Sequence, residues 1–288
     1  MTPQKIEESP SRGAPSSADP LADVLAKATL LWSIALMHFV ESDFLSSHRG
    51  IFSSLSTLPS LTALMLINPG PGAFDAVASL LQLQSIFWIY PSSKGDNIGP
   101  IFFTDFARAL EPSSSSLKEI IVYDESSESS PAVADFHPRV FPNVRSLSLR
   151  GVTTSAHQIA PQFPDLVAIG GGMDLNCSHS GQWLRLNSID TDWSTVVDFA
   201  HQHPLWHVYA RWLGYRPRNN FLHFVDGIRH CPVKCLTLET CASAECAPVW
   251  RLQLIADGLP DLRCLDITFD MPPHAAESTE KVCHSQTV

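Results

Sequence analysis

A nine-residue phrase that recurs along the chain constrains its fold more than any other feature. Residues 58–66 read LPSLTALML, residues 141–149 read FPNVRSLSL and residues 259–267 read LPDLRCLDI. A fourth copy begins FPDL at residue 163 and reaches Ile169. The shared template is apolar-Pro-x-apolar-x-x-apolar-x-apolar. A phrase that returns in this way is typical of proteins built from stacked units, each too small to bury its own apolar face.

The last three apolar positions of the template extend the repeat over most of the chain. Further matches are Leu31/Ile34/Leu36, Leu83/Ile86/Trp88, Leu117/Ile120/Val122 and Val233/Leu236/Leu238, with a weaker one at Leu205/Val208/Ala210 and a poor one near Leu184 and Ile189. The first of the three positions, here called the anchor, stands at residues 31, 61, 83, 117, 144, 166, 184, 205, 233 and 262. Anchors lie 18 to 34 residues apart, inside or near the window of about 20–29 residues that leucine-rich repeats show.

Helical spacing of apolar residues precedes many of the anchors. It predicts helices over residues 74–83, 102–110, 192–203, 220–229 and 250–256. Pro112 is expected to stop the second helix, Asp192 to cap the third and Gly258 to close the last. A helix, a short loop and a strand, repeated, predict a parallel sheet faced by helices. We therefore predict an α/β fold, an irregular leucine-rich-repeat solenoid (horseshoe), with parallel strands on its concave face and helices on its convex face.

The solenoid is expected to span residues 21–270. Residues 1–20 are polar, with Pro at 4 of the 20 positions, and predict a disordered leader, as residues 271–288 predict a disordered tail. The first apolar run, Ala28–Val40, is shorter than the roughly 20 residues that a membrane span needs. It therefore predicts a buried element and no membrane partner.

Composition narrows the function classes. Hydrophobic residues make up 44% of the chain, enough for a large core, which excludes disorder of the whole chain. The net charge of −10 argues against a nucleic-acid partner, because such a partner needs a basic face. The leader has no apolar stretch for a secretory signal, and the cysteines number seven. An odd cysteine count indicates free thiols in a reducing compartment, so we expect a cytoplasmic or nuclear protein that is not secreted.

Four cysteines lie close together at positions 231, 235, 241 and 246. Their spacing differs from the paired Cys-x-x-Cys knuckles of common zinc sites. Cys235 and Cys264 instead occupy the same template position, where other copies have small residues: Ser33, Ala63, Ser85 and Ser146. The column of small residues is expected to serve stacking between units, and no metal is predicted.

Two further patterns invite a chemical interpretation and do not support it. Gly170-Gly171-Gly172 is followed by no Lys-Ser or Lys-Thr, so a degenerate strand with a tight turn is favoured over a phosphate loop. His201 and His203, with His207 nearby, could offer imidazole ligands, but residues two apart at a helix end point in different directions. Surface or capping histidines are the favoured interpretation.

The remaining candidates for chemistry also have simpler interpretations. Asp190 and Asp192 could act as an acid–base pair, although Asp192 is more simply a helix cap. Residues 211–218, RWLGYRPR, could stack on nucleobases, but such a stretch more often forms cation–π pairs or the rim of a protein contact. We predict no catalytic residue, no cofactor and no enzymatic activity.

The surface most suited to binding follows from the strands. Alternate residues of a strand face opposite sides, so residues between the template's apolar positions face the concave side. That face is apolar in its N-terminal half and polar and charged in its C-terminal half. The apolar half is either an interaction site or is covered by the leader or by loops. The protein-binding residues predicted on this face are Phe87, Tyr123, Arg150, Tyr209, Arg211 and Glu239.

The repeats as a set resemble the leucine-rich-repeat region of F-box proteins, particularly the divergent kind found in mushroom-forming (basidiomycete) fungi. The phrases that carry the resemblance are LSTLPSLTALML, FPNVRSLSL, CPVKCLTLET and LPDLRCLDITF, and it covers roughly residues 21–270. The resemblance implies a protein–protein interaction module that selects substrates for a ubiquitin ligase.

One departure from the family changes that expectation. An F-box opens with a Leu-Pro and acidic signature near the N-terminus, and residues 1–30 contain no such stretch. The segment that docks on the ligase scaffold is therefore missing from the pattern. The alternatives are a non-ligase leucine-rich-repeat scaffold and a truncated gene product.

Overall fold

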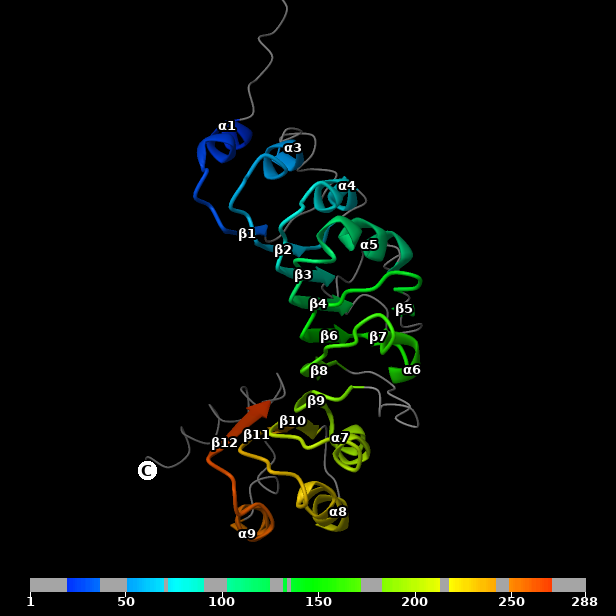
Figure 1. Ribbon diagram of the computed structural model, residues 1–288. Helices are drawn as coiled ribbons and strands as arrows, with labels where there is room; N and C mark the ends of the chain where they lie inside the picture. The colour runs from blue at the N-terminus through cyan, green and yellow to red at the C-terminus, as the bar shows by residue number, and fades with distance from the viewer. Residues whose placement is uncertain are drawn as a thin grey trace, which may run out of the picture.

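The structure is a computed structural model in which residues 20–36, 51–69, 72–90, 103–124, 132–133, 136–171, 183–212, 218–241 and 249–270 are described. Its centre is a 10-stranded parallel sheet whose strands follow one another in chain order. The strands line the inner side of an arc, and the helices lie along its outer side (Figure 1). The predicted α/β architecture with a parallel sheet faced by helices is confirmed.

The strands are short and most of them alternate between half-buried and buried residues. They are β1 (Ser33–Leu36), β2 (Ala63–Ile67), β3 (Ser85–Tyr90), β4 (Glu119–Asp124), β6 (Ser146–Arg150), β8 (Ala168–Gly170), β9 (Ser188–Asp192), β10 (His207–Trp212), β11 (Cys235–Cys241) and β12 (Cys264–Asp270). A second, two-stranded sheet pairs β5 (Ala132–Val133) with β7 (Val152–Thr153). Because side chains alternate across a strand, the buried set faces the helices and the half-buried set forms the concave face.

The connections between strands differ along the arc. The helices are α1 (Pro20–Lys27), α3 (Ile51–Leu55), α4 (Gly72–Ala78), α5 (Phe103–Leu110), α6 (Ala156–Ile159), α7 (Trp193–Ala200), α8 (Arg218–Ile228) and α9 (Val249–Gly258). The α-helix α5 ends at Leu110, as predicted from Pro112, and the chain continues into the 3₁₀ turn η1 (Glu111–Ser113). The predicted helix over residues 74–83 is too long, because α4 ends at Ala78 and Leu81 is exposed.

The apolar run Ala28–Val40 is not the buried element predicted. Its residues 31–36 lead into and form β1, and Ile34 is buried, whereas Leu30 and Trp32 are 87% and 66% exposed. The run lies at the first strand of the stack, so one flank has no preceding described unit to pack against. Residues 37–40 lie outside the described residues. In the part of the chain that is described, no helix combines the length and apolarity that crossing a membrane requires.

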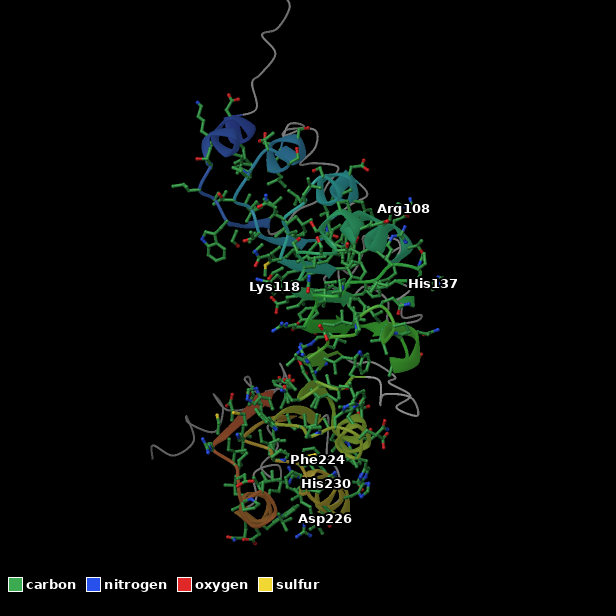
Figure 2. All side chains as sticks on the ribbon, viewed as in Figure 1. Arg108, Lys118, His137, Phe224, Asp226 and His230 are labelled. Carbon is green, nitrogen blue, oxygen red and sulfur yellow. The ribbon has the colours of Figure 1, made fainter. Side chains whose placement is uncertain are left out.

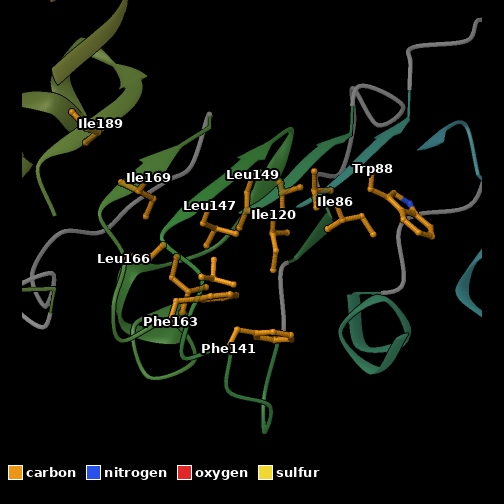
Figure 3. Close-up of a cluster of buried hydrophobic side chains, with 14 of the residues drawn as sticks. Ile86, Trp88, Ile120, Phe141, Leu147, Leu149, Phe163, Leu166, Ile169 and Ile189 are labelled. Carbon is orange, nitrogen blue, oxygen red and sulfur yellow. The ribbon is translucent and has the colours of Figure 1, made fainter. Parts of the chain in front are cut away.

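The strand register places equivalent template positions side by side. Ser33 pairs with Ala63, and Cys235 pairs with Cys264, as the small-residue column predicts. The central apolar position forms a second column that runs through the core (Figure 3) and comprises Ile86, Ile120, Leu147, Ile169 and Ile189. Each unit therefore buries its apolar side chains against its two neighbours, which is the source of stability in a stacked fold.

The anchor predicted at Leu184 is wrong and lies two residues too early. Leu184 is 91% exposed, whereas Trp183 and Leu186 are buried. The anchor is therefore Leu186, and Trp183 takes the position that Phe163 holds in the preceding unit, three residues ahead of the anchor. The indole Nε1 of Trp183 donates a hydrogen bond to the carbonyl of Phe163 at 2.9 Å, which fixes this alignment.

Aromatic rings fill the space where helices are short. Between β4 and β9 the only described helix is the single turn α6. Phe136 lies there at the centre of a group of rings, 5.0 to 6.4 Å between centroids, formed with Phe103, Phe106, Phe141 and Phe163. Large flat side chains replace the volume that a longer helix would supply.

The predicted leader and tail fall almost entirely outside the described residues, which begin at Pro20 and end at Asp270. Pro20 itself begins α1.

Candidate functional site

Polar side chains gather on the concave face between β4 and β11. Tyr123 and Arg150 come from β4 and β6, Asp190 and Arg211 from β9 and β10, and Glu239 from β11. Strand alternation turns all of them to the same face, because each lies between two buried apolar positions or directly after one. We call these residues, together with Tyr209, the concave network.

Asp190 is the centre of the concave network. Arg150 Nη2 donates to Asp190 Oδ2 at 3.1 Å, and Arg211 Nη2 donates to Asp190 Oδ1 at 3.0 Å. One carboxylate therefore holds two guanidinium groups from different strands. All three side chains are about one third exposed or less, so the pairs are partly shielded from solvent.

Arg150 reaches Asp190 across an intervening strand. The register places Gly170 of β8 between Ser148 and Asp190. A Cβ atom at Gly170 would lie 3.3 Å from the Cβ of Asp190, so a larger residue would crowd this crossing. The degenerate glycine strand thus has a role in the site: it leaves room for an ion pair between β6 and β9.

The other side of the Arg150 guanidinium lies on an aromatic ring. Its central carbon is 4.8 Å from the centroid of the Tyr123 ring. Burial by itself would lower the pKa of Arg150, but the carboxylate of Asp190 outweighs it, and the pKa of Arg150 is raised above its ordinary value. The guanidinium stays charged and is held in one position by a carboxylate and a ring.

Tyr209 and Glu239 extend the concave network to β11. The Tyr209 hydroxyl donates to Glu239 Oε2 at 2.8 Å, and Arg211 Nε lies 4.0 Å from the same oxygen. Burial and then the hydrogen bond to the Glu239 carboxylate raise the pKa of Tyr209 to about 12. Both effects disfavour a phenolate beside an existing negative charge.

This raised pKa predicts how the protein responds to alkali. An unfolded tyrosine ionises near pH 10, whereas Tyr209 in the folded protein keeps its proton up to about pH 12. The stabilisation by the protonated Tyr209 is therefore fully present below pH 10 and is lost as the pH rises from about 10 to about 12. Ultraviolet titration of tyrosinate should show one group ionising with a pKa of about 12. Tyr209→Phe should remove that group and cost about 1 kcal/mol of unfolding free energy at neutral pH, because the site is partly exposed. If the group that is lost in Tyr209→Phe ionises near pH 10 in the wild type, the Tyr209 hydroxyl does not donate to Glu239.

The structure brings five of the six predicted binding residues together and leaves the sixth apart. Phe87 lies on β3 between Met65 and Ile121, in the apolar half of the concave face, where all three are half-buried. Asp190, the residue that links the others, was considered at the sequence level as an acid–base candidate and not as a member of the binding set. The strand register reveals its role, because Asp190 pairs with Tyr209. The sequence pattern, with its anchor at Leu184, instead predicts Ser188 beside Tyr209.

The histidines interpreted as surface or capping residues have two different environments. His201 is exposed and its ring is stacked on His230, with centroids 5.4 Å apart. His203 is buried and stacked on Phe199, so the surface interpretation is wrong for this residue. The two side chains belong to different contacts, as their spacing of two residues predicts.

Other sequence candidates have structural roles. Asp192 caps α7 by accepting hydrogen bonds from the backbone N–H groups of Ser194 and Thr195, which confirms the predicted cap. Burial by itself would raise the pKa of Asp192, but hydrogen bonds from the side-chain hydroxyls and backbone N–H groups of Ser194 and Thr195 lower it. In the stretch 211–218, Arg211 turns onto the sheet toward Asp190, and residues 213–217 lie outside the described residues. Cys246 also lies outside them, and no group of three potential metal ligands occurs among the residues that are described.

The geometry defines a class of site: a set of charged and aromatic side chains held in place by one another on the concave face of a parallel sheet. The chain matches no protein-family model, and no curated protein matches its sequence.

Proposed function

We propose that the chain is a protein–protein interaction module, built as an irregular leucine-rich-repeat solenoid, which binds a protein partner through its concave face. Three observations support the repeat assignment: equivalent template positions pair on neighbouring strands, the strands of the parallel sheet follow chain order, and the units differ in length. Supporting the binding role is the concave network. The proposal includes no catalytic activity and no cofactor.

The single observation that carries the proposal is the ordering of charged side chains on an exposed face. Two arginines, two carboxylates and two tyrosine rings are joined by hydrogen bonds or close contacts, yet remain partly exposed. Arginine and tyrosine are enriched where protein interfaces are energetically strongest. Because the network already holds these side chains in place, less side-chain entropy is lost when a partner binds.

By its resemblance to fungal F-box repeats, the partner would be a substrate presented to a ubiquitin ligase, with the ligase scaffold as a second partner only where an F-box exists upstream. The alternative is a non-ligase scaffold or a truncated gene product. A cytoplasmic or nuclear location is part of this proposal.

The test is affinity purification of the full chain from cells, with quantitative mass spectrometry of what it retains. Arg211→Ala should reduce capture of the specific partners by about tenfold, the loss typical of a central interface arginine. Arg229→Ala is the matched control, because Arg229 is exposed on the helix side and pairs only with the neighbouring Asp226. Equal capture by wild type and Arg211→Ala, with both proteins folded by circular dichroism, would place the partner site elsewhere. Presence of the ligase adaptor among the captured proteins separates the ligase role from a plain scaffold.

A further inference from the structure

A second surface follows from the residue that comes directly after each anchor. These residues lie where the strands begin, and we call them the strand-start column: Trp32, Thr62, Gln84, Lys118, Arg145, Val167, Asn187, Trp206, Lys234 and Arg263. From Thr62 onward, the backbone N–H of each column residue donates a hydrogen bond to the backbone carbonyl of the column residue on the preceding strand, with N···O distances of 2.7 to 3.0 Å. This unbroken ladder makes the column one continuous feature of the stack, from β1 to β12.

The charge of the column is opposite to the charge of the protein. Carboxylates outnumber cations in the chain by 29 to 19, yet the column holds four cations and no carboxylate. Lys118, Arg145 and Arg263 are exposed, and Lys234 is half-buried. Arg185 is also exposed and lies two residues ahead of Asn187.

These cations are not neutralised by the described part of the protein. Five other arginines form ion pairs with carboxylates: Arg108, Arg139, Arg150, Arg211 and Arg229. Among the described residues, the column cations form none, although Glu119, Asp165 and Asp261 lie within two residues of column positions. Lys118 Nζ donates to Gln84 Oε1 at 2.8 Å, and Lys234 Nζ lies 4.6 Å from the centroid of the Trp206 ring. Their charge is therefore free to act on a partner.

Two tryptophans share the column with the cations. Trp206 is 44% exposed and lies between Asn187 and Lys234, and Trp32 is exposed at the first strand. Tryptophan and arginine are both enriched in protein–protein interfaces, so their presence together in the column favours a binding role. The column thus has two pairs of cations, Lys118 with Arg145 and Lys234 with Arg263, and an exposed tryptophan, Trp206, between the pairs.

We propose that the strand-start column binds an acidic, extended segment of a protein partner. From β4 to β12 the cations span seven strands of the sheet, about 29 Å at the usual spacing of neighbouring strands. An extended peptide covers that distance with about nine residues. A nucleic acid is the less favoured polyanion, because its dense charge would meet the net charge of −10 on the rest of the protein.

The column and the concave network lie at different levels along the strands. Lys118 is on the strand side of the molecule, as the network is, and away from Arg108 and His137 on the helix side (Figure 2). Along the strands, Asp190 and Tyr209 come three residues after the column position, and the other four network residues come five residues after it, toward the opposite end of the strand. Binding at the column therefore does not depend on the proposed function of the concave face, and either can fail while the other stands.

The test uses the full chain and a fluorescent peptide of about nine residues in which Glu alternates with Ser, so that successive carboxylates face one side. Fluorescence anisotropy at low ionic strength should show binding that weakens as salt is added. The triple variant Lys118→Gln, Arg145→Gln and Arg263→Gln should bind about tenfold more weakly, the sum of three exposed charge contacts. The matched control removes three exposed cations that lie in helices or directly after one: Lys27→Gln, Arg108→Gln and Arg229→Gln.

Three outcomes would overturn the proposal. Equal loss of affinity in the column variant and the control would show that only net charge matters. Loss of peptide binding in Arg211→Ala would assign the peptide to the concave network. Tighter binding of a single-stranded oligonucleotide of about nine nucleotides than of the peptide would make the partner a nucleic acid.

Discussion

Replacement of Phe136 by alanine is expected to lower the unfolding free energy by about 4 kcal/mol. Phe136 is 2% exposed and its ring lies against Phe103, Phe106, Phe141 and Phe163. It comes from the connection between β4 and β6, whose described residues form no helix, so few described side chains could move in to fill the space. The cost is the transfer free energy of the ring together with the cavity left among four rigid neighbours.

Urea unfolding followed by circular dichroism measures this change, with the slope of the transition as a check on cooperativity. Phe136→Leu keeps most of the volume and should cost roughly 1.5 kcal/mol. Leu184→Ala is the control, because Leu184 is almost fully exposed and its loss should change stability by less than about 0.5 kcal/mol. A loss below about 1 kcal/mol for Phe136→Ala would mean that the aromatic group does not hold these units together.

The strands and their stacking could be predicted because each strand carries its own signal. In β2, Leu64 and Leu66 are apolar and two apart, and the anchor Leu61 lies three residues before them. Because the same pattern recurs in most units, the sequence also predicts that Cys235 and Cys264 share one column, and the strand register confirms it. A pattern that is local and repeated is the kind a sequence expresses most directly.

The concave network could not be predicted in the same way, because its ion pairs join residues that are far apart in the sequence. Arg150 and Asp190 are forty residues apart, and they meet only because Gly170 leaves the intervening strand bare. With Leu184 as the anchor instead of Leu186, Asp190 is still predicted on the concave face, but beside Arg211 instead of Tyr209, so its central place in the network is missed. The spacing from Trp183 to Leu186, equal to that from Phe163 to Leu166, would have corrected it.

The helical connections were the least predictable part. Apolar spacing predicted α7 and α8 well, since both bury a continuous stripe against the sheet. Between β4 and β8 the chain fills the same layer with Phe136, Phe141 and Phe163 instead of a long helix. Rings that meet from separate loops leave no periodic trace in the sequence.

Gly171→Ala is expected to cost about 3 kcal/mol or more, and Gly170→Ala less than about 1 kcal/mol, although the two glycines are neighbours. Gly171 has φ +126°, a conformation that residues with a side chain rarely adopt, and a Cβ there would lie 2.0 Å from the carbonyl oxygen of Leu149. That oxygen belongs to the backbone of β6 and cannot move without breaking the stack. A Cβ at Gly170 meets only side chains, Ser148 Oγ at 3.2 Å and Asp190 Cβ at 3.3 Å, which can shift by a few tenths of an ångström.

The same pair of variants separates the stability of the turn from the arrangement of the concave network. Gly170→Ala should leave the urea midpoint nearly unchanged while it crowds the path of Arg150 to Asp190, so its effect should appear in partner capture. Gly171→Ala should shift the midpoint strongly, because the strain is in the backbone. Equal midpoints for the two variants would show that the turn after β8 relaxes freely, and then the glycine run would be explained by the ion-pair crossing alone.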